Sequence, residues 1–284
     1  MVSVAGPRPS LTTSSLLDER VRLAAHLAAL GGRVARERFQ HAAVMAWKHD
    51  GSMLTAADVE IQQRLETEIA AHFPQDDVFG EEMPTPVPRS LRARHWWILD
   101  PIDGTNNFGR GVPGFCVSVG IFRDGMPWAG AVYDPLSDWL FTAAIGVGAW
   151  LNGTPLRFTP SELSGRSLFS VRSPFVGGVP PFVQEWLQRY RLRRVGSTAL
   201  QLYYVALGGL AFVHDHGASI WDVAGALPVL LEAGGRFTGV DGTSPFPLAA
   251  DRAASPMTFL AGDPLAHGRI VTELARLADV VPSA

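Results

Sequence analysis

The sequence predicts an α+β first half and an α/β second half within a chain of 284 residues. Two helical stripes of apolar residues come first, and a run of consecutive strands joined by short turns follows them. Beyond residue 158, strand patterns and helix patterns alternate instead. We therefore expect two parts, 1–158 with an antiparallel sheet and 159–284 with an α/β arrangement, meeting at a polar stretch that carries Pro160 and Gly165.

Two helices are predicted near the start of the chain. After a loose tail, Ser14 or Ser15 caps a helix that runs to about Phe39, because leucine and valine side chains recur there at helical spacing. Thr55 begins a second helix, whose apolar residues repeat every four positions, and Pro74 ends it.

Short strands are expected next, separated by turn residues such as Asp124-Gly125 and Asn152-Gly153. Consecutive strands with tight turns pair antiparallel, which predicts one continuous sheet for this region. The predicted strands and the final hairpin cover 78–82, 96–99, 115–122, 128–133, 140–144 and 149–156.

In the second half, three strands and three helices are expected in alternation. Two strands cover 168–171 and 211–214, and a further strand between them ends at 194–196. The helices cover 181–190, 198–207 and 221–233. Gly208-Gly209 and Gly234-Gly235 end the second and third helices. Pro228 lies inside the third helix and should kink it or loosen a turn, because proline has no N–H to donate.

Composition and cysteine usage exclude several classes of protein. A formal net charge of −3 and an isoelectric point near 6.2 give no basic face for nucleic acid. The single cysteine, Cys116, excludes an intrachain disulfide and fits a reducing compartment. The start of the chain lacks the apolar core of a signal peptide, and no window reaches the roughly 18 apolar residues of a membrane span. We expect a cytoplasmic protein that binds neither nucleic acid nor membrane.

The chemistry centres on the stretch WILDPIDGTNNF, residues 97–108. Asp100 falls at the end of a buried strand that Pro101 stops, and Asp103 falls in the loop beyond it. A helix can begin at Thr105, with its first N–H groups facing the carboxylates. Carboxylate oxygens suit hard cations and backbone N–H groups suit a phosphate, which together favour phosphate ester hydrolysis. The alternative is that Asp-Pro-x-Asp-Gly simply makes a turn.

Other acids occupy helix starts. Asp58 lies three residues after Thr55, and Asp222 lies three residues after Ser219, so helix capping is the alternative interpretation for both carboxylates. Glu232, near the end of its helix, is unfavourably placed for the helix dipole, which hints at a specific partner.

Further polar features have simpler interpretations. The His-Asp-His run at 214–216 is a poor zinc site, because neighbours on a strand point to opposite faces and no second cluster supports it. Asp215, seven residues before Asp222, can reach the rim of a shared pocket. The arginines between 191 and 194 are typical of a solvated edge rather than a phosphate clamp. Cys116 is expected in the core.

Taken together, these motifs resemble the inositol monophosphatase family of Mg²⁺-dependent, lithium-sensitive phosphatases. The matching runs, in order, are Lys48-x-Asp50-Gly51-Ser52-x-x-Thr55-x-x-Asp58, Gly80-Glu81-Glu82, Asp100-Pro101-x-Asp103-Gly104-Thr105-x-Asn107-Phe108, Gly196-Ser197, Trp221-Asp222 and Glu232-Ala233-Gly234-Gly235. One run alone would be weak, but the central run with flanking motifs in the right order is specific. The resemblance implies a layered αβαβα sandwich of the inositol monophosphatase and fructose-1,6-bisphosphatase type, with the site between its halves.

The resemblance also assigns roles to residues. For metal binding, it implies a first Mg²⁺ held by Glu81, Asp100 and the carbonyl oxygen of Ile102, a second held by Asp100, Asp103 and Asp222, and a third, weaker ion involving Glu81. For phosphate and substrate, it implies the N–H groups of Gly104 and Thr105, the Gly196-Ser197-Thr198 run, Asp103 and Asp215. For catalysis, it implies Asp58 and Thr105 orienting the attacking water together with Glu81.

The resemblance implies hydrolysis of a small polyol or sugar phosphate such as inositol 1-phosphate. Paired cations neutralise the phosphate dianion, activate water and stabilise the leaving alkoxide. We expect direct attack by water, without a phosphoenzyme. Because the family is often dimeric, we also expect a homodimer.

Departures from the family pattern leave the substrate open. Thr198 stands where inositol-specific members tend to have alanine. Residues 110–113 and Pro228 resemble histidinol-phosphate phosphatases, whereas 116–120 and 133–135 resemble ordinary inositol monophosphatases. Fructose 1,6-bisphosphate or a 3′(2′),5′-bisphosphate nucleotide would need an extra cationic pocket, which the sequence does not locate.

Two other classes of protein remain to be weighed. A catalytically silent phosphate-binding regulator would have lost a metal carboxylate, and none is lost here. A calcium-stabilised structural protein is disfavoured, because the chain lacks the oxygen-rich loop spacing of an EF-hand.

Overall fold

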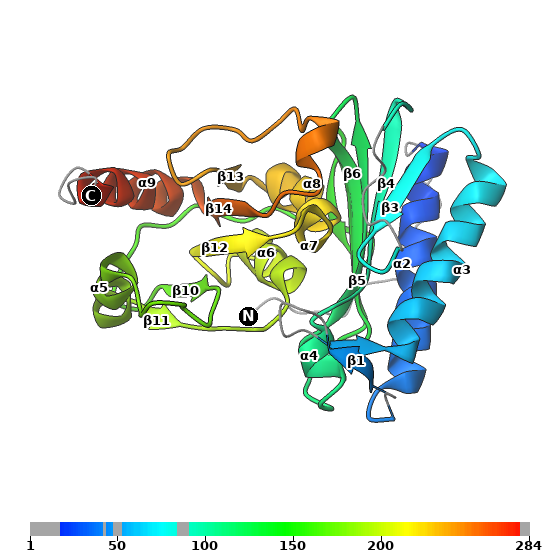
Figure 1. The fold of residues 1–284 in the computed structure, drawn as a ribbon. Coiled ribbons are helices and arrows are strands. Elements are labelled where there is room, and N and C mark those ends of the chain that lie inside the picture. The colour runs from blue at the N-terminus through cyan, green and yellow to red at the C-terminus, as the bar shows by residue number, and fades with distance from the viewer. Residues whose placement is uncertain (1–17, 42–43, 48–52, 84–90, 279–284) are drawn as a thin grey trace.

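The computed structural model describes residues 18–41, 44–47, 53–83 and 91–278. Two sheets alternate with three layers of helices (Figure 1), which confirms the predicted αβαβα sandwich. Among the described residues, no helix combines the length and apolarity needed to cross a bilayer. The layers, in order, are α2 (Glu19–Arg38) with α3 (Ala56–His72), a seven-stranded sheet, α6 (Thr198–Ala206) with α7 (Ile220–Ala224) and α8 (Ala226–Ala233), a five-stranded sheet, and α5 (Pro181–Arg189) with α9 (Pro264–Ala278).

The seven-stranded sheet has the order β3-β4-β5-β6-β7-β8-β9. β3 and β4 pair in parallel, and the other neighbours are antiparallel, as the tight turns predicted. Between β8 and β9, Asn152 and Gly153 have φ angles of 50° and 78°, which suit a two-residue hairpin turn. The strands are β3 (Asp77–Gly80), β4 (His95–Asp103), β5 (Cys116–Arg123), β6 (Met126–Asp134), β7 (Trp139–Ala144), β8 (Gly148–Leu151) and β9 (Thr154–Pro155).

The five-stranded sheet has the order β11-β10-β12-β14-β13 and is mixed. β10 is parallel to β11 and β12, whereas β14 is antiparallel to β12 and β13. The strand predicted to end at 194–196 is β11, and it ends earlier, at Leu192. β12 also runs beyond its predicted end at His214, since β14 gives it a partner along its whole length. The strands are β10 (Leu168–Val171), β11 (Arg191–Leu192), β12 (Phe212–Ala218), β13 (Arg236–Thr238) and β14 (Met257–Gly262).

The first helix of the described chain, α2, is capped by Asp18, whose carboxylate accepts a 2.8 Å hydrogen bond from the N–H of Arg20. The predicted caps, Ser14 and Ser15, lie outside the described residues. A small hairpin precedes α3, and part of its connection also lies outside the described residues. The remaining elements are β1 (Val44–Trp47) and β2 (Met53–Thr55) of that hairpin, the short helix α4 (Thr105–Phe108) and the 3₁₀ turn η1 (Ala250–Arg252).

The single helix predicted at 221–233 is two helices, α7 and α8, with a break at Gly225. Pro228 explains the position of the break. It has no N–H to donate to the carbonyl of Ala224, and its ring crowds that carbonyl, so α7 ends there. The predicted effect of this proline is confirmed.

Glycines allow the junction of α7 and α8 to lie directly on the seven-stranded sheet. A Cβ atom on Gly120 of β5 would lie 2.5 Å from the carbonyl carbon of Ala224. A Cβ atom on Gly130 of β6 would lie 2.2 Å from the carbonyl oxygen of Gly225. Both contacts join backbone to backbone, so neither partner can rotate away. The close approach fixes α7 beside β4 and β5.

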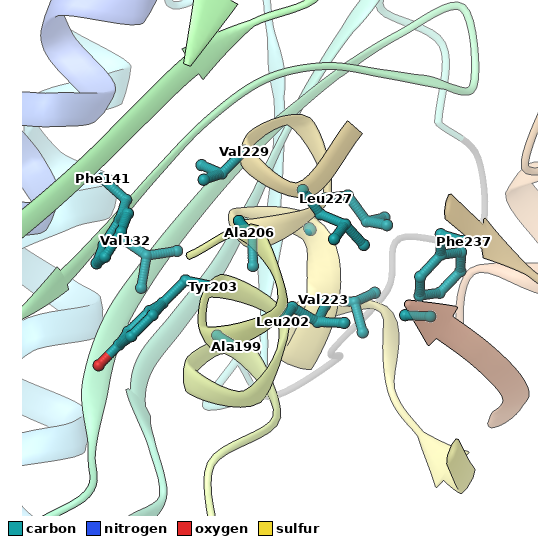
Figure 2. Close-up of a cluster of buried hydrophobic side chains, with 14 of the residues drawn as sticks. Val132, Phe141, Ala199, Leu202, Tyr203, Ala206, Val223, Leu227, Val229 and Phe237 are labelled. Atoms are coloured by element: carbon teal, nitrogen blue, oxygen red, sulfur yellow. The ribbon is translucent and has the colours of Figure 1, made fainter. Parts of the chain in front are cut away.

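Apolar side chains from both parts of the chain fill the space between the sheets (Figure 2). Tyr203 of α6 stacks on Phe141 of β7, with ring centroids 4.2 Å apart. Leu227 of α8 lies in the same buried cluster as Phe237 of β13. The division at residue 158 stays a prediction, because helices of the second part pack on the sheet of the first.

Candidate active site

A bulge in β4 positions the two central acids. Asp100 pairs with Ser118 and Asp103 pairs with Cys116, so two residues beginning with Pro101 oppose a single residue of β5. The bulge accommodates a proline, which cannot donate to the sheet ladder. The expectation that the strand stops at Pro101 and leaves Asp103 in a loop was therefore wrong: β4 continues, and Asp103 is its last residue.

Asp103 lies at the N-terminus of α6. Its Oδ2 accepts hydrogen bonds from the Ser197 hydroxyl and the Ala199 N–H, each 2.6 Å long, and its Oδ1 accepts one of 3.2 Å from the Thr198 N–H. The N–H groups of a helix start carry partial positive charge and stabilise a carboxylate. Ser197 and Thr198, predicted as substrate-binding residues, thus hold a predicted metal ligand in place. Sequence reasoning missed this role, because it depends on a contact between distant segments.

Asn107 fastens α4 to the segment before α6. Its Nδ2 donates to the carbonyl oxygens of Gly114, at 2.7 Å, and Val195, at 2.8 Å. Gly196 has a φ of 86°, and a Cβ atom there would lie 2.8 Å from Nδ2 of Asn107. Gly196, predicted to bind substrate, is therefore required for this close packing in any case.

The residues predicted to orient water lie together. The Thr105 hydroxyl donates to the carbonyl oxygen of Ile102 at 2.8 Å and lies 3.4 Å from Oδ1 of Asp58. Asp58 is buried, and its Oδ2 accepts the N–H of Thr55 at 2.8 Å and the Thr55 hydroxyl at 2.5 Å. The predicted capping box of α3 is thus confirmed. Gly104, with a φ of 98°, turns the chain from β4 into α4.

Neighbouring negative charges raise the pKa values of two acids that come from different elements. Burial raises the pKa of Asp103 to about 6; its three hydrogen bonds oppose this, and the negative charge of Glu81 adds to it. Burial also raises the pKa of Asp222 well above its usual range, and the charges of Asp103 and Glu81 raise it further. Glu81 directly follows β3, and Asp222 accepts the N–H of Ser219 at 2.9 Å in the first turn of α7. Acids that are far apart in sequence therefore share one electrostatic environment.

Arg172 joins Asp215, another of the predicted acids, to this group. Asp215 is buried in β12, and its Oδ1 lies 3.4 Å from Nη1 of Arg172, while its Oδ2 lies 3.4 Å from the Thr198 hydroxyl. The same Arg172 nitrogen lies 3.9 Å from Oδ2 of Asp222. Sequence reasoning missed Arg172. The signal was its place one residue beyond β10, since β10 runs parallel to β12 and their ends meet at one edge.

The carboxylate donors suit Mg²⁺ by their chemistry. Burial raises the pKa of Asp103, and burial together with the charge of Asp103 raises the pKa of Asp222, so a bound cation would favour the charged form of both. Within the described residues, no three Asp, Glu, His or Cys side chains are gathered closely enough to hold an ion by themselves. Mg²⁺ needs one or two carboxylates, because water and phosphate oxygens complete its shell. The donors fit Mg²⁺ as an open site.

Residues outside this group have structural partners. His214 packs on Phe182 and Trp186 of α5, and burial lowers its pKa to about 4, so it is neutral. Cys116 is fully buried as predicted, and burial raises its pKa well above the usual range. Glu232 accepts the backbone N–H of Gly146 at 2.8 Å, which supplies the partner that its position hinted at.

Comparison with known proteins decides the family. A sequence profile of the inositol monophosphatase family matches residues 16–278. Inositol monophosphatase 1 of Solanum lycopersicum is 33% identical over 248 residues, which cover 84% of this chain and 90% of that protein. The chain belongs to the inositol monophosphatase family.

Solved structures agree with this family assignment. The Thermotoga maritima IMPase matches with a TM-score of 0.80 at 26% identity, covering 93% of this chain and 99% of that one. An IMPase/NADP phosphatase solved with Mg²⁺ and phosphate shares the fold, with a TM-score of 0.75 at 23% identity over 88% of this chain and 93% of that one. As an inositol monophosphatase family member, the chain is a Mg²⁺-dependent phosphoric monoester hydrolase.

The raised pKa of Asp103 predicts pH-dependent stability of the metal-free phosphatase. Because the pKa is about 6 when folded against 3.8 ordinarily, the folded state holds this proton more tightly, and stability falls as pH rises through 6. That difference corresponds to about 3 kcal/mol of unfolding free energy. In EDTA, the wild type should lose more stability between about pH 4 and pH 6.5 than Asp103→Asn, which cannot ionise. Thermal unfolding measures this, and equal losses in both proteins would contradict it.

Proposed function

We propose that this family member hydrolyses the phosphate monoester of a small polyol or sugar, such as inositol 1-phosphate. The observation that carries the proposal is the convergence of Glu81, Asp103 and Asp222 on one electrostatic environment beside the Thr105–Asp58 pair. The Solanum lycopersicum relative, named as an inositol monophosphatase, supports the choice of a polyol phosphate.

The residue roles follow from chemistry and from the contacts described. When bound, Mg²⁺ would neutralise the phosphate dianion and lower the pKa of an attacking water. The Thr105 hydroxyl, fixed between the Ile102 carbonyl and Asp58, aims that water, and Glu81 accepts its proton. The water oxygen bonds to phosphorus as the ester oxygen leaves on the opposite side, and that oxygen takes up a proton to become the hydroxyl of the product. Asp215 accepts a hydrogen bond from a hydroxyl of the leaving group.

We also propose the ligand sets that the family resemblance implies. Their support is the donor chemistry of the site. The first ion would use Glu81, Asp100 and the Ile102 carbonyl, the second Asp100, Asp103 and Asp222, and a third Glu81, with phosphate oxygens on the N–H groups of Gly104 and Thr105. The family resemblance supports a homodimer, and the single cysteine supports a cytoplasmic location.

A phosphate-release panel tests the proposal and separates it from its alternatives. The esters are inositol 1-phosphate, histidinol phosphate, fructose 1,6-bisphosphate and 3′-phosphoadenosine 5′-phosphate, each assayed with Mg²⁺ and with EDTA. We expect Mg²⁺-dependent release that is fastest with inositol 1-phosphate. Release that is fastest with histidinol phosphate would favour that enzyme class, as Pro228 suggests. No release from any ester would favour a catalytically silent phosphate-binding regulator.

A further inference from the structure

Two arginines stand beside Asp215, where the proposed function places the leaving group. Nη1 of Arg172 lies 3.4 Å from Oδ1 of Asp215, and the Arg172 side chain is 35% exposed. Arg194 donates to both the hydroxyl and the carbonyl oxygen of Ser173, the residue that follows Arg172. Arg172 therefore supplies one guanidinium group, and the neighbouring Ser173 holds that of Arg194 by hydrogen bonds.

The electrostatics place these arginines near each other and near Asp215. Burial lowers the pKa of Arg194, the positive charge of Arg172 lowers it further, and Asp215 opposes the change. Arg172 in turn lowers the pKa of Asp215, whose burial raises it. His216, on the same strand, also lowers the pKa of Asp215. The rim beside Asp215 is thus a cationic surface with one buried carboxylate in it.

Positive charge is in excess on this rim once Asp222 binds a metal ion. Arg172 then keeps Asp215 as its carboxylate partner, and the two described bonds of Arg194 go to neutral oxygens of Ser173. A guanidinium has five N–H donors in a planar fork, and the described ion pairs of Arg172 use the donors on Nη1. Its other edge suits a carboxylate or phosphate, which guanidinium groups bind bidentately.

We propose that Arg172, together with Arg194, makes this phosphatase prefer esters whose leaving group carries its own negative charge, either a carboxylate or a second phosphate. The proposal rests on the proposed phosphatase function of the same site and names the substrate class more narrowly. The two guanidinium groups would supply the positive charge that bisphosphate substrates require. Hydrolysis itself is unchanged: water bonds to phosphorus, the ester bond breaks, and the leaving oxygen is protonated.

Matched ester pairs test the preference. Glycerol 2-phosphate and 2-phosphoglycerate differ by one hydroxymethyl group replaced with a carboxylate. Fructose 1-phosphate and fructose 1,6-bisphosphate make the second pair and separate a phosphate source of charge from a carboxylate source. In at least one pair, the wild type should show a kcat/KM for the charged ester about ten-fold higher or more, as expected for a charge-assisted hydrogen bond.

The variants assign the preference to the arginines. Arg172→Gln should bring that ratio down to about one, Arg194→Gln should lower it partly, and Arg172→Lys should retain part of it. Arg193→Gln is the matched control, because this exposed arginine donates to the carbonyl of Leu192 and should leave the ratio unchanged. Circular dichroism checks that each variant folds. If Arg172→Gln does not fold, the lowered ratio expected for Arg194→Gln still tests the proposal.

Three outcomes would overturn the proposal. A wild-type kcat/KM ratio near one in both pairs, with glycerol 2-phosphate or fructose 1-phosphate still hydrolysed, would contradict the preference for charged leaving groups. It would not contradict the proposed phosphatase function. An unchanged ratio in Arg172→Gln, with Mg²⁺ binding altered in calorimetry, would show that Arg172 is a counter-ion for Asp222 instead. No Mg²⁺-dependent hydrolysis of any of the four esters would overturn both the preference and the proposed function.

Discussion

Asp100→Asn is expected to lower Mg²⁺-dependent phosphate release by at least about a thousand-fold, comparable to the loss of a principal electrostatic stabiliser. Asp100 is 1% exposed and lies in β4 just before the bulge. Asparagine keeps the shape of the side chain and removes its charge, and the proposed function gives this carboxylate to two ions. The measurement is steady-state phosphate release over a range of Mg²⁺ concentrations.

Asp134→Asn is the control for this prediction. Asp134 is also buried, but it accepts hydrogen bonds from the N–H of Leu136 and the hydroxyls of Ser137 and Tyr203, none of which is a proposed metal ligand. The Asp134→Asn variant should lose about 1–3 kcal/mol of stability, as expected when a buried hydrogen-bond network is weakened. Its folded molecules should keep the kcat of the wild type. Comparable activity loss in both variants, or substantial residual activity in Asp100→Asn, would remove the metal assignment.

Gly130→Ala is expected to destabilise the protein by at least about 2 kcal/mol. The glycine has no left-handed φ, so alanine suits its conformation, but the added Cβ would lie 2.2 Å from the carbonyl oxygen of Gly225. Relief requires the junction of α7 and α8 to move away from β6, which also displaces Asp222. Thermal unfolding should show Tm lowered by at least roughly 4 °C, because 1 kcal/mol shifts Tm by about 2–4 °C in proteins of this size.

Gly268→Ala is the matched control. This glycine lies on the exposed face of α9, and a Cβ atom there would meet nothing within 4 Å. Alanine should be neutral or should stabilise the helix by up to about 1 kcal/mol, because it costs less backbone entropy. If Gly130→Ala proved as stable as Gly268→Ala, the close packing of the middle helices on the sheet would be wrong.

Much of the fold was predictable because its signals are local. Helical spacing, the Thr55–Asp58 box and the Asn152–Gly153 turn each depend on a few neighbouring residues, and the structure contains them as expected. The β4 bulge was missed, because Pro101 looks like a strand end until β5 is seen to pair on both sides of it. Strand boundaries such as the end of β12 were missed for the same reason.

The candidate site divides in the same way. The types and order of its acids are visible in the sequence, and they were enough to predict a metal-dependent phosphatase. The supporting contacts were not visible. Ser197 and Thr198 read as substrate residues, yet they hold Asp103, and Arg172 carried no motif at all. Such contacts depend on which strand ends and helix starts meet in space, and the local sequence does not encode that.

The hydrogen bonds that hold the Asp103 carboxylate have a consequence for partly folded molecules. All three of its donors come from the beginning of α6, which belongs to the other part of the chain. A molecule in which the middle layer has loosened would still contain every strand of the first sheet, yet this carboxylate would have lost its anchor. In a heated or denaturant-treated sample, the rate of phosphate release should therefore be proportional to the number of fully folded molecules. It should fall even where spectroscopic signals from the first sheet persist.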